Sequence, residues 1–164
     1  MEFPVSEHEP GAEALAAAVE GLPRPRVLLI DGIDPARSVD GAGDRIRLCG
    51  GTAAPWDDAG ARALSDAEIV AYDPQVIVAL AGAEDLDDAE EDLRARHAWC
   101  DLEAAHGFDA YVADRTAFLA LPRILATILH PTEFTEMLPP NSVRLAVPKA
   151  PADPEDEEDA EGDA

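Results

Sequence analysis

Residues 65–82 read SDAEIVAYDPQVIVALAG and contain the signals of a helix, a tight turn and a buried strand in direct succession. Ser65 and Glu68 form a capping box, in which each side chain satisfies an unpaired amide of the first helical turn. The run over 76–80 is apolar throughout, as is typical of a strand buried on both faces, and Gly82 ends it. The segment therefore predicts one helix and strand unit of an α/β domain.

Two other apolar runs predict two further buried strands. The run over 26–30 is ended by Asp31 and Gly32, and the shorter run over 110–113 follows a turn at Gly107. Residues 143–147 predict an additional edge strand. Between the strands, apolar spacing predicts helices over 12–22, 45–49 and 121–129, and a longest helix along the stripe of Leu86, Ala89, Leu93 and Cys100.

Strands that alternate with helices imply right-handed crossovers between neighbouring strands. The predicted fold class is therefore α/β, with a single Rossmann-like lobe whose small, mostly parallel sheet carries helices on both faces. We expect a flexible N-terminus over 1–11 and the lobe over 12–147. We also expect an acidic, disordered tail over 148–164, because proline and acidic residues dominate it and leave nothing to bury.

The protein carries 35 acidic against 12 basic residues, a formal net charge of −23. The excess is not confined to the tail, since 27 acidic residues remain when the eight acids between Asp153 and Asp163 are removed. Such a field repels phosphate backbones and anionic lipids, so it argues against nucleic-acid binding and a peripheral membrane role. With Lys149 as the single lysine, the composition suggests a halophilic protein whose self-repulsion is screened by dense counterions.

The sequence also predicts where the protein is located. Residues 1–10 contain no basic region followed by an apolar stretch, and no run of about eighteen apolar residues occurs in the chain. We therefore expect a protein that is not exported, has no membrane insertion and lies in the cytoplasm.

The residue types that commonly bind metals or perform catalysis do not occur here in the spacings typical of metal or catalytic sites. Cys49 and Cys100 lack CxxC spacing, so buried and inert thiols are expected rather than a disulfide or a zinc ribbon. His130 is expected to cap a helix end, and no metal is assigned to the scattered residues His8, His97 and His106. No nucleophile, base and orienting group can be placed together, and no cofactor is assigned, so we expect the protein not to be an enzyme.

Several short motifs occur in the order of a known family. They are LCGGT over 48–52, DPQVIV over 73–78, WCDL over 99–102, YVAD over 111–114 and LHPTEF over 129–134. In this order they resemble the C-terminal lobe of the helical-hinge, or class III, substrate-binding proteins of ABC importers, of the type that serves cobalamin and iron-siderophore transport. The resemblance covers roughly residues 12–134. It implies that the N-terminal lobe and the export signal are missing and that a partner chain would complete the ligand cleft.

The resemblance also implies roles for two residues. Trp56 follows the Gly50-Gly51 turn and is similar to the tryptophan that lines the cleft in cobalamin-binding relatives, with a loop tryptophan covering the sheet edge as the alternative. Family members dock on their permease through a glutamate two residues after the serine that begins the helix. Here Ala67 stands at that position, so Glu68, one residue later, is the candidate for partner docking, with a role in the capping box as the alternative.

Arg115 and Thr116 are candidates on grounds of architecture. They follow the third predicted strand, and in a parallel α/β sheet the segment after the carboxyl end of a strand faces the ligand crevice. Arg115 is therefore a candidate contact for a carboxylate or amide of a ligand, with a solvated loop arginine as the alternative.

Two functional hypotheses remain open. In the first, the chain is a noncatalytic binding lobe that contacts a corrinoid or siderophore-like ligand through Trp56 and the loop that holds Arg115. In the second, it is a degenerate lobe that serves as a protein-interaction or accessory module in cobalamin or metal-cofactor metabolism. In the second hypothesis, the face that lined the ligand cleft in the ancestor now covers a partner chain.

Overall fold

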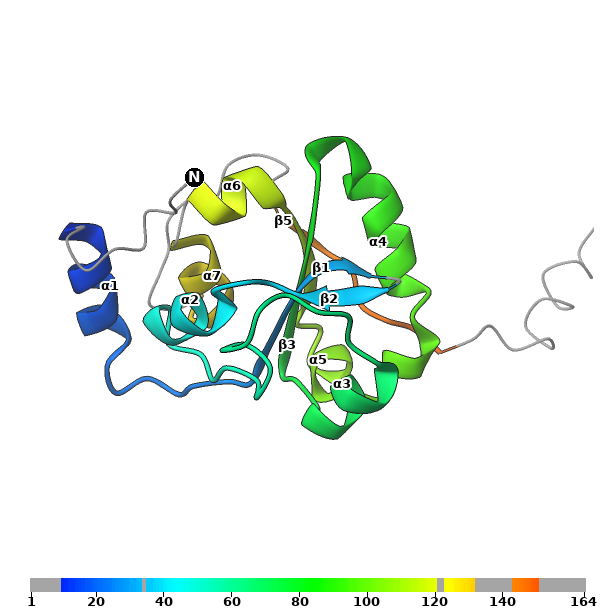
Figure 1. Ribbon diagram of the computed structural model, residues 1–164, viewed down its shortest axis with the longest axis horizontal. Helices are drawn as coiled ribbons and strands as arrows, with labels where there is room; N and C mark the ends of the chain where they lie inside the picture. Colours follow the sequence, from blue (N-terminus) through cyan, green and yellow to red (C-terminus); the bar gives the residue numbers. More distant parts are fainter. Residues whose placement is uncertain (1–9, 34, 121–122, 132–142, 151–164) are drawn as a thin grey trace, which may run out of the picture.

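The apolar run at 76–80 lies in the central strand of a five-stranded sheet in the computed structural model, which describes residues 10–33, 35–120, 123–131 and 143–150 (Figure 1). The strand order is β2-β1-β3-β4-β5. The three inner strands are parallel and comprise β1 (Val27–Ile33), β3 (Val76–Ala81) and β4 (Ala110–Asp114). Both edge strands, β2 (Ala36–Ser38) and β5 (Val143–Leu145), are antiparallel to their neighbours. The predicted α/β class with a mostly parallel sheet is confirmed.

Alternation along the inner strands gives the sheet two apolar faces. Leu28, Ile30 and Ile77 point into one core cluster, whereas Leu29 and Val78 point into the other. A buried side chain of this size contributes about 1.5–3 kcal/mol relative to an exposed one. Both faces must therefore be covered, and the inner strands cannot occur without two layers of helices.

The helices form these two layers on opposite sides of the sheet (Figure 1). One layer contains α3 (Asp66–Tyr72), α4 (Leu86–Arg94) and α5 (Glu103–His106). The other contains α1 (Pro10–Val19), α2 (Ala42–Leu48), α6 (Arg115–Ala120) and α7 (Arg123–Leu129). Two short 3-10 turns, η1 (Ala83–Asp85) and η2 (His97–Trp99), flank α4. Among the residues described, no helix is long and apolar enough to span a membrane.

The predicted longest helix is wrong, because the chain turns after Arg94. α4 has nine residues and α1 has ten, and the three-residue η2 turn follows α4. Cys100, the last member of the predicted stripe, lies beyond this break, and Trp99 just before it is fully buried, with its Nε1 donating a hydrogen bond to Asp66 at 3.0 Å. The Arg96 guanidinium lies 4.7 Å from the centre of the Trp99 ring. Burial of this aromatic ring accounts for the break in the helix.

The segment after β1 also differs from the predicted loop. β1 continues through Asp31 and Gly32 to Ile33, and the chain returns antiparallel as β2. Gly32 has a φ of +85° and lies where the register between the two strands shifts. A glycine at this irregularity lets the strand turn back without the steric cost of a side chain.

The structure also describes residues 148–150, at the start of the predicted tail. Pro148 is buried, and the backbone amide of Lys149 donates to the carbonyl of Arg94 at 3.0 Å. Residues 148–150 therefore pack against the end of α4. Composition alone did not predict these contacts, because they depend on a helix that lies far away in the sequence. Residues 1–9 and 151–164, which hold most of the predicted N-terminus and tail, lie outside the described residues.

The turn at Gly50 provides a test of the packing between α1, α2 and the end of α7. Gly50 has a φ of +85°, and a Cβ atom there would lie 2.5 Å from Nε2 of His130 and 2.8 Å from Cβ of Val19. We predict that Gly50→Ala costs about 1 kcal/mol for the backbone conformation and a further ~1–3 kcal/mol for the overlap. Chemical denaturation measures this loss.

Gly21→Ala is the matched control for this substitution. Gly21 has a φ of +83°, and no atom would lie within 4 Å of a Cβ atom added there, so only the conformational cost applies. Equal losses of stability in the two variants would contradict the packing described here.

Candidate functional site

The ends of the three parallel strands meet at one edge of the sheet, here named the carboxyl edge. Asp31 in β1 is in register with Leu80 in β3, and Ala81 is in register with Asp114 in β4. Ligand crevices of open parallel sheets lie outside this edge. The fold therefore selects the residues that end β1, β3 and β4 as the candidate site.

Arg115 lies at the carboxyl edge, as predicted, but in a helix rather than a loop. It is the first residue of α6, which begins directly after β4. Its Nη2 and Nε lie 2.5 and 3.2 Å from the same Oδ1 atom of Asp31. Both side chains are about two-fifths exposed, so the pair lies at the surface of the site.

Thr116 is exposed beside Arg115 in the first turn of α6. Its backbone amide donates to Oδ1 of Asp114 at 3.1 Å, which satisfies one of the free amides at the start of the helix. The far end of α6 is also held, because Arg45, which is 5% exposed, donates from Nη2 to the carbonyl of Leu119 at 3.0 Å. These contacts fix the helix that presents Arg115 and Thr116.

A pocket of about 290 Å³ lies at the carboxyl edge and is named the edge pocket. Its floor comes from the strand ends and includes Gly32, Ile33, Ala81 and Gly82. Its walls include Arg115 from α6 and three carboxylates at the start and along one side of α4, Asp85, Asp88 and Asp92. No aromatic side chain is among the described residues that line it.

Two other hollows are less suitable. One of about 470 Å³ lies at the opposite end of β3 and β4, and Pro131 and Val143, which flank the undescribed residues 132–142, border it. The other, of about 200 Å³, lies beside Arg45, whose guanidinium donates to carbonyls of α6. Of these three hollows, the edge pocket is the one at the carboxyl ends of the parallel strands, where ligand crevices form.

Trp56 does not lie in the edge pocket. The indole is 7% exposed and packs edge to face on Tyr72, with 5.4 Å between the ring centres. Tyr72 in turn donates to the carbonyl oxygens of Val27 and Thr52, at the end of β1 opposite to the carboxyl edge. The structure therefore places Trp56 in the core, an environment similar to the alternative of a loop tryptophan that covers the sheet edge. Its contact with a ligand stays a prediction.

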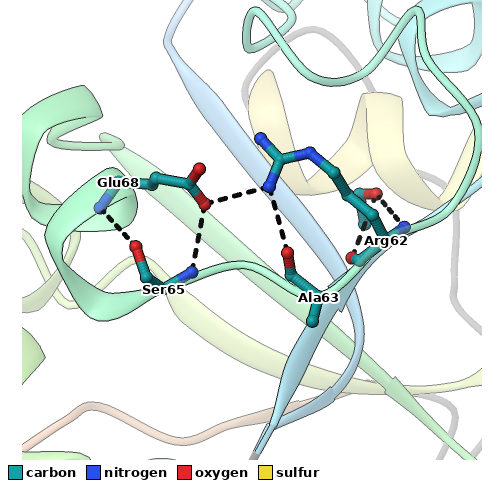
Figure 2. A network of polar contacts seen from close by, with 5 residues as sticks. Arg62, Ala63, Ser65 and Glu68 are labelled. Carbon is teal, nitrogen blue, oxygen red and sulfur yellow. Dashed lines mark hydrogen bonds and ion pairs between the residues drawn. The ribbon is translucent and has the colours of Figure 1, made fainter.

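Glu68 is engaged locally, as Figure 2 shows. Its Oε2 accepts hydrogen bonds from the Ser65 amide and from Nη1 of Arg62, both at 3.1 Å, and the Ser65 hydroxyl accepts from the Glu68 amide. These interactions lower the pKa of Glu68, first through the hydrogen bond from Arg62. The predicted capping box is confirmed, and partner docking through Glu68 stays a prediction.

Within the described ranges, no three His, Cys, Asp or Glu side chains are grouped so that they could hold a metal ion. His130 is buried with its Nε2 3.2 Å from the carbonyl oxygen of Gly50, and His97 has its Nδ1 2.5 Å from that of Lys149. Both imidazoles thus contact backbone carbonyl groups.

Comparison with solved structures identifies the architecture. The chain is similar to the TroA-like periplasmic binding protein FepB from Veillonella parvula, with a TM-score of 0.63 and 19% identity over 77% of this chain and 45% of that one. An ABC transporter substrate-binding protein from Listeria monocytogenes gives 0.64 and 18% over 74% and 53%. The molybdate-bound MolA protein from Haemophilus influenzae gives 0.61 and 17% over 76% and 42%. No family model and no curated protein matches the sequence.

The chain has the fold of one lobe of the class III binding proteins. It spans about half the length of these solved binding proteins. The lobe fold that the ordered motifs implied is thus confirmed by structures that share fewer than one residue in four with this chain. Of the motifs, the last part of LHPTEF lies outside the described residues.

The comparison corrects the predicted location. The absence of a leader in residues 1–10 predicted the cytoplasm, but the structural neighbours are periplasmic binding proteins and point to an extracytoplasmic place. The pattern of residues 1–10 was therefore not sufficient to predict the location.

Sequence patterns alone do not bring the other residues of the edge pocket together. In the sequence, Asp31 and Gly82 mark the ends of strands, and the acidic residues of α4 read as a solvated helix face. No spacing in the sequence links these two groups of residues. The rule that ligand crevices lie outside carboxyl ends selects Arg115 and Thr116 when it is applied after the third strand alone. Applied to all three strands, it selects Asp31, Gly82 and Arg115.

Asp57, next to Trp56, yields a prediction on the pH dependence of stability. Its side chain is 2% exposed, Oδ2 accepts from the Ala54 amide at 2.7 Å, and Oδ1 has no hydrogen-bond partner in the described part of the chain. Burial raises the pKa of Asp57 from 3.8 to about 6. The folded chain therefore holds this proton more tightly than the unfolded chain, so its stabilising effect is complete at low pH and is lost as the pH rises through 6.

We predict that Asp57→Asn raises the free energy of unfolding at pH 8 by on the order of 2 kcal/mol and changes it far less at pH 4, close to the ordinary pKa of an aspartate. Denaturation at the two pH values measures the difference. Asp58→Asn is the control, because Asp58 is exposed and pairs with Arg47. The account of Asp57 fails if the two variants respond alike to pH.

Proposed function

We propose that the chain is a noncatalytic, ligand-binding lobe of a substrate-binding protein that serves an ABC importer, and that its ligand-binding surface is the carboxyl edge. The observation that carries the proposal is the edge pocket, which lies where β1, β3 and β4 end and where α4 and α6 begin. The lobe fold supports it, because the solved neighbours include periplasmic and substrate-binding proteins.

The size of the pocket supports a half-site rather than a complete one. Its volume of about 290 Å³ is at the lower limit for small-molecule sites, which typically enclose ~300–1,000 Å³ and bury most of the ligand. A single face leaves much of a ligand in water and forgoes contact area. We therefore propose that a second lobe or a partner chain closes over the carboxyl edge.

The sequence motifs and the solved neighbours point to different ligands. The motif order favours a corrinoid or a ferric siderophore, whereas the solved neighbours include a protein bound to molybdate. A flat macrocycle is commonly held by aromatic stacking, and the edge pocket has no aromatic side chain among its described residues. A corrinoid or hemin would need such contacts from the closing partner.

Filling the pocket tests the proposal. Gly82 lines the pocket at a φ of −65°, and a Cβ atom there would meet Oδ2 of Asp85 at 3.4 Å, an ordinary van der Waals contact. Gly82→Leu should therefore fold and place its side chain in the edge pocket. Calorimetric titration in concentrated KCl with cobalamin, a ferric siderophore, hemin, molybdate and spermidine measures the effect.

We predict that a ligand of this panel binds the wild-type chain, and that Gly82→Leu weakens it at least about tenfold, or 1.4 kcal/mol. Gly60→Leu is the control, because Gly60 is exposed and no atom lies within 4 Å of an added Cβ. The proposed surface is wrong if both variants bind as the wild type does, or if no member of the panel binds.

A further inference from the structure

The ion pair between Arg115 and Asp31 changes what the edge pocket can attract. Arg115 is the basic side chain among the described residues that line the pocket. Two of its nitrogen atoms, Nε and Nη2, donate to the single Oδ1 atom of Asp31. Asp31 itself is not among the residues that line the pocket, and its carboxylate neutralises the charge of Arg115. The positive charge that an anionic ligand would seek is already compensated.

The remaining charges of the pocket have the opposite sign. Asp85, Asp88 and Asp92 are exposed, line the pocket, and have no Arg or Lys partner among the described residues. The three aspartates outnumber the one arginine of the described lining, and the pairing of Arg115 with Asp31 leaves their negative charge unopposed. Charges within a few ångströms of a ligand discriminate its sign more strongly than the diffuse field of the whole protein.

The spacing of these carboxylates favours an extended cation over a bare metal ion. At a rise of ~1.5 Å per residue, Asp92 in α4 lies about 10 Å along the helix axis from Asp85, the residue that precedes α4. Oxygen ligands of one hard metal ion must all lie ~2.0–2.6 Å from it. A ligand with several separated positive groups, such as a polyamine, fits this spacing better.

We propose that the edge pocket takes a positively charged, amine-bearing ligand, and that Asp31 strengthens this charge preference because it neutralises Arg115. This inference rests on the proposed function, since it assumes that the ligand binds at the carboxyl edge. It adds a ligand class and a specificity-determining residue to that site.

The inference is tested by Asp31→Asn with two probes of opposite charge, spermidine and molybdate. Asparagine keeps an oxygen that accepts from Arg115, so the arginine stays in place while its charge is released. The measured quantity is the ratio of the two dissociation constants, obtained by calorimetric titration of the full chain in KCl. We predict that Asp31→Asn shifts this ratio toward molybdate by about tenfold, the scale of a charge-assisted hydrogen bond.

Glu91→Gln is the matched control, because it removes the same charge from an exposed residue of α4 that does not line the pocket. Its ratio should remain within about twofold of the wild-type value, since salt screens distant charges. An unchanged ratio in Asp31→Asn, or an equal shift in Glu91→Gln, would overturn the role of Asp31. Thermal unfolding of both variants checks that each is folded.

A second substitution tests the same pair from its other side. Arg115→Gln removes the positive charge and leaves Asp31 unpaired, so the ratio should shift toward spermidine. A shift toward molybdate would contradict the inference. If both substitutions at the pair leave the ratio unchanged while Gly82→Leu still weakens binding about tenfold, the binding surface stands and only the charge preference is lost.

Discussion

Burial of β1, β3 and β4 on both faces is the constraint on which the rest of this structure depends. A parallel strand in the middle of a sheet has no face available for water, so its side chains must be apolar on both sides. Two layers of helices follow from that requirement, and each crossover returns the chain to the same end of the sheet. The carboxyl ends therefore converge at one edge, and polar residues that follow the strands are brought together there without any local sequence signal.

The sequence predicted the elements that this constraint governs and failed where tertiary contacts decide. The apolar runs at 76–80 and 110–113 and the capping box at Ser65 are local signals, and the structure has these elements in place. The turn after Arg94 depends on burial of Trp99 against Asp66, which lies far away in sequence. Likewise, the hairpin formed by β1 and β2 depends on pairing between short segments that lack apolar periodicity.

The candidate site was predictable only in part, for the same reason. Arg115 and Thr116 directly follow a recognisable strand, so a rule of architecture sufficed to select them. Asp31 is paired with Arg115 across 84 positions of the sequence, a contact that no spacing indicates. Trp56 was selected by a motif rather than by architecture, and its packing against Tyr72 is another contact that no spacing indicates. In a chain with 35 acidic residues, single carboxylates carry little information until the fold shows which of them share a pocket.

The central claim is that ligands meet this lobe at the carboxyl edge, and amide chemical-shift mapping by NMR tests it most directly. The isotope-labelled chain would be titrated in concentrated KCl with the ligand that binds it most tightly. The account predicts that the largest shifts fall on the amides of Gly32, Gly82, Arg115 and Thr116. Largest shifts around Trp56 and Tyr72, or at the opposite end of the strands near Gln75 and Asp109, would contradict it.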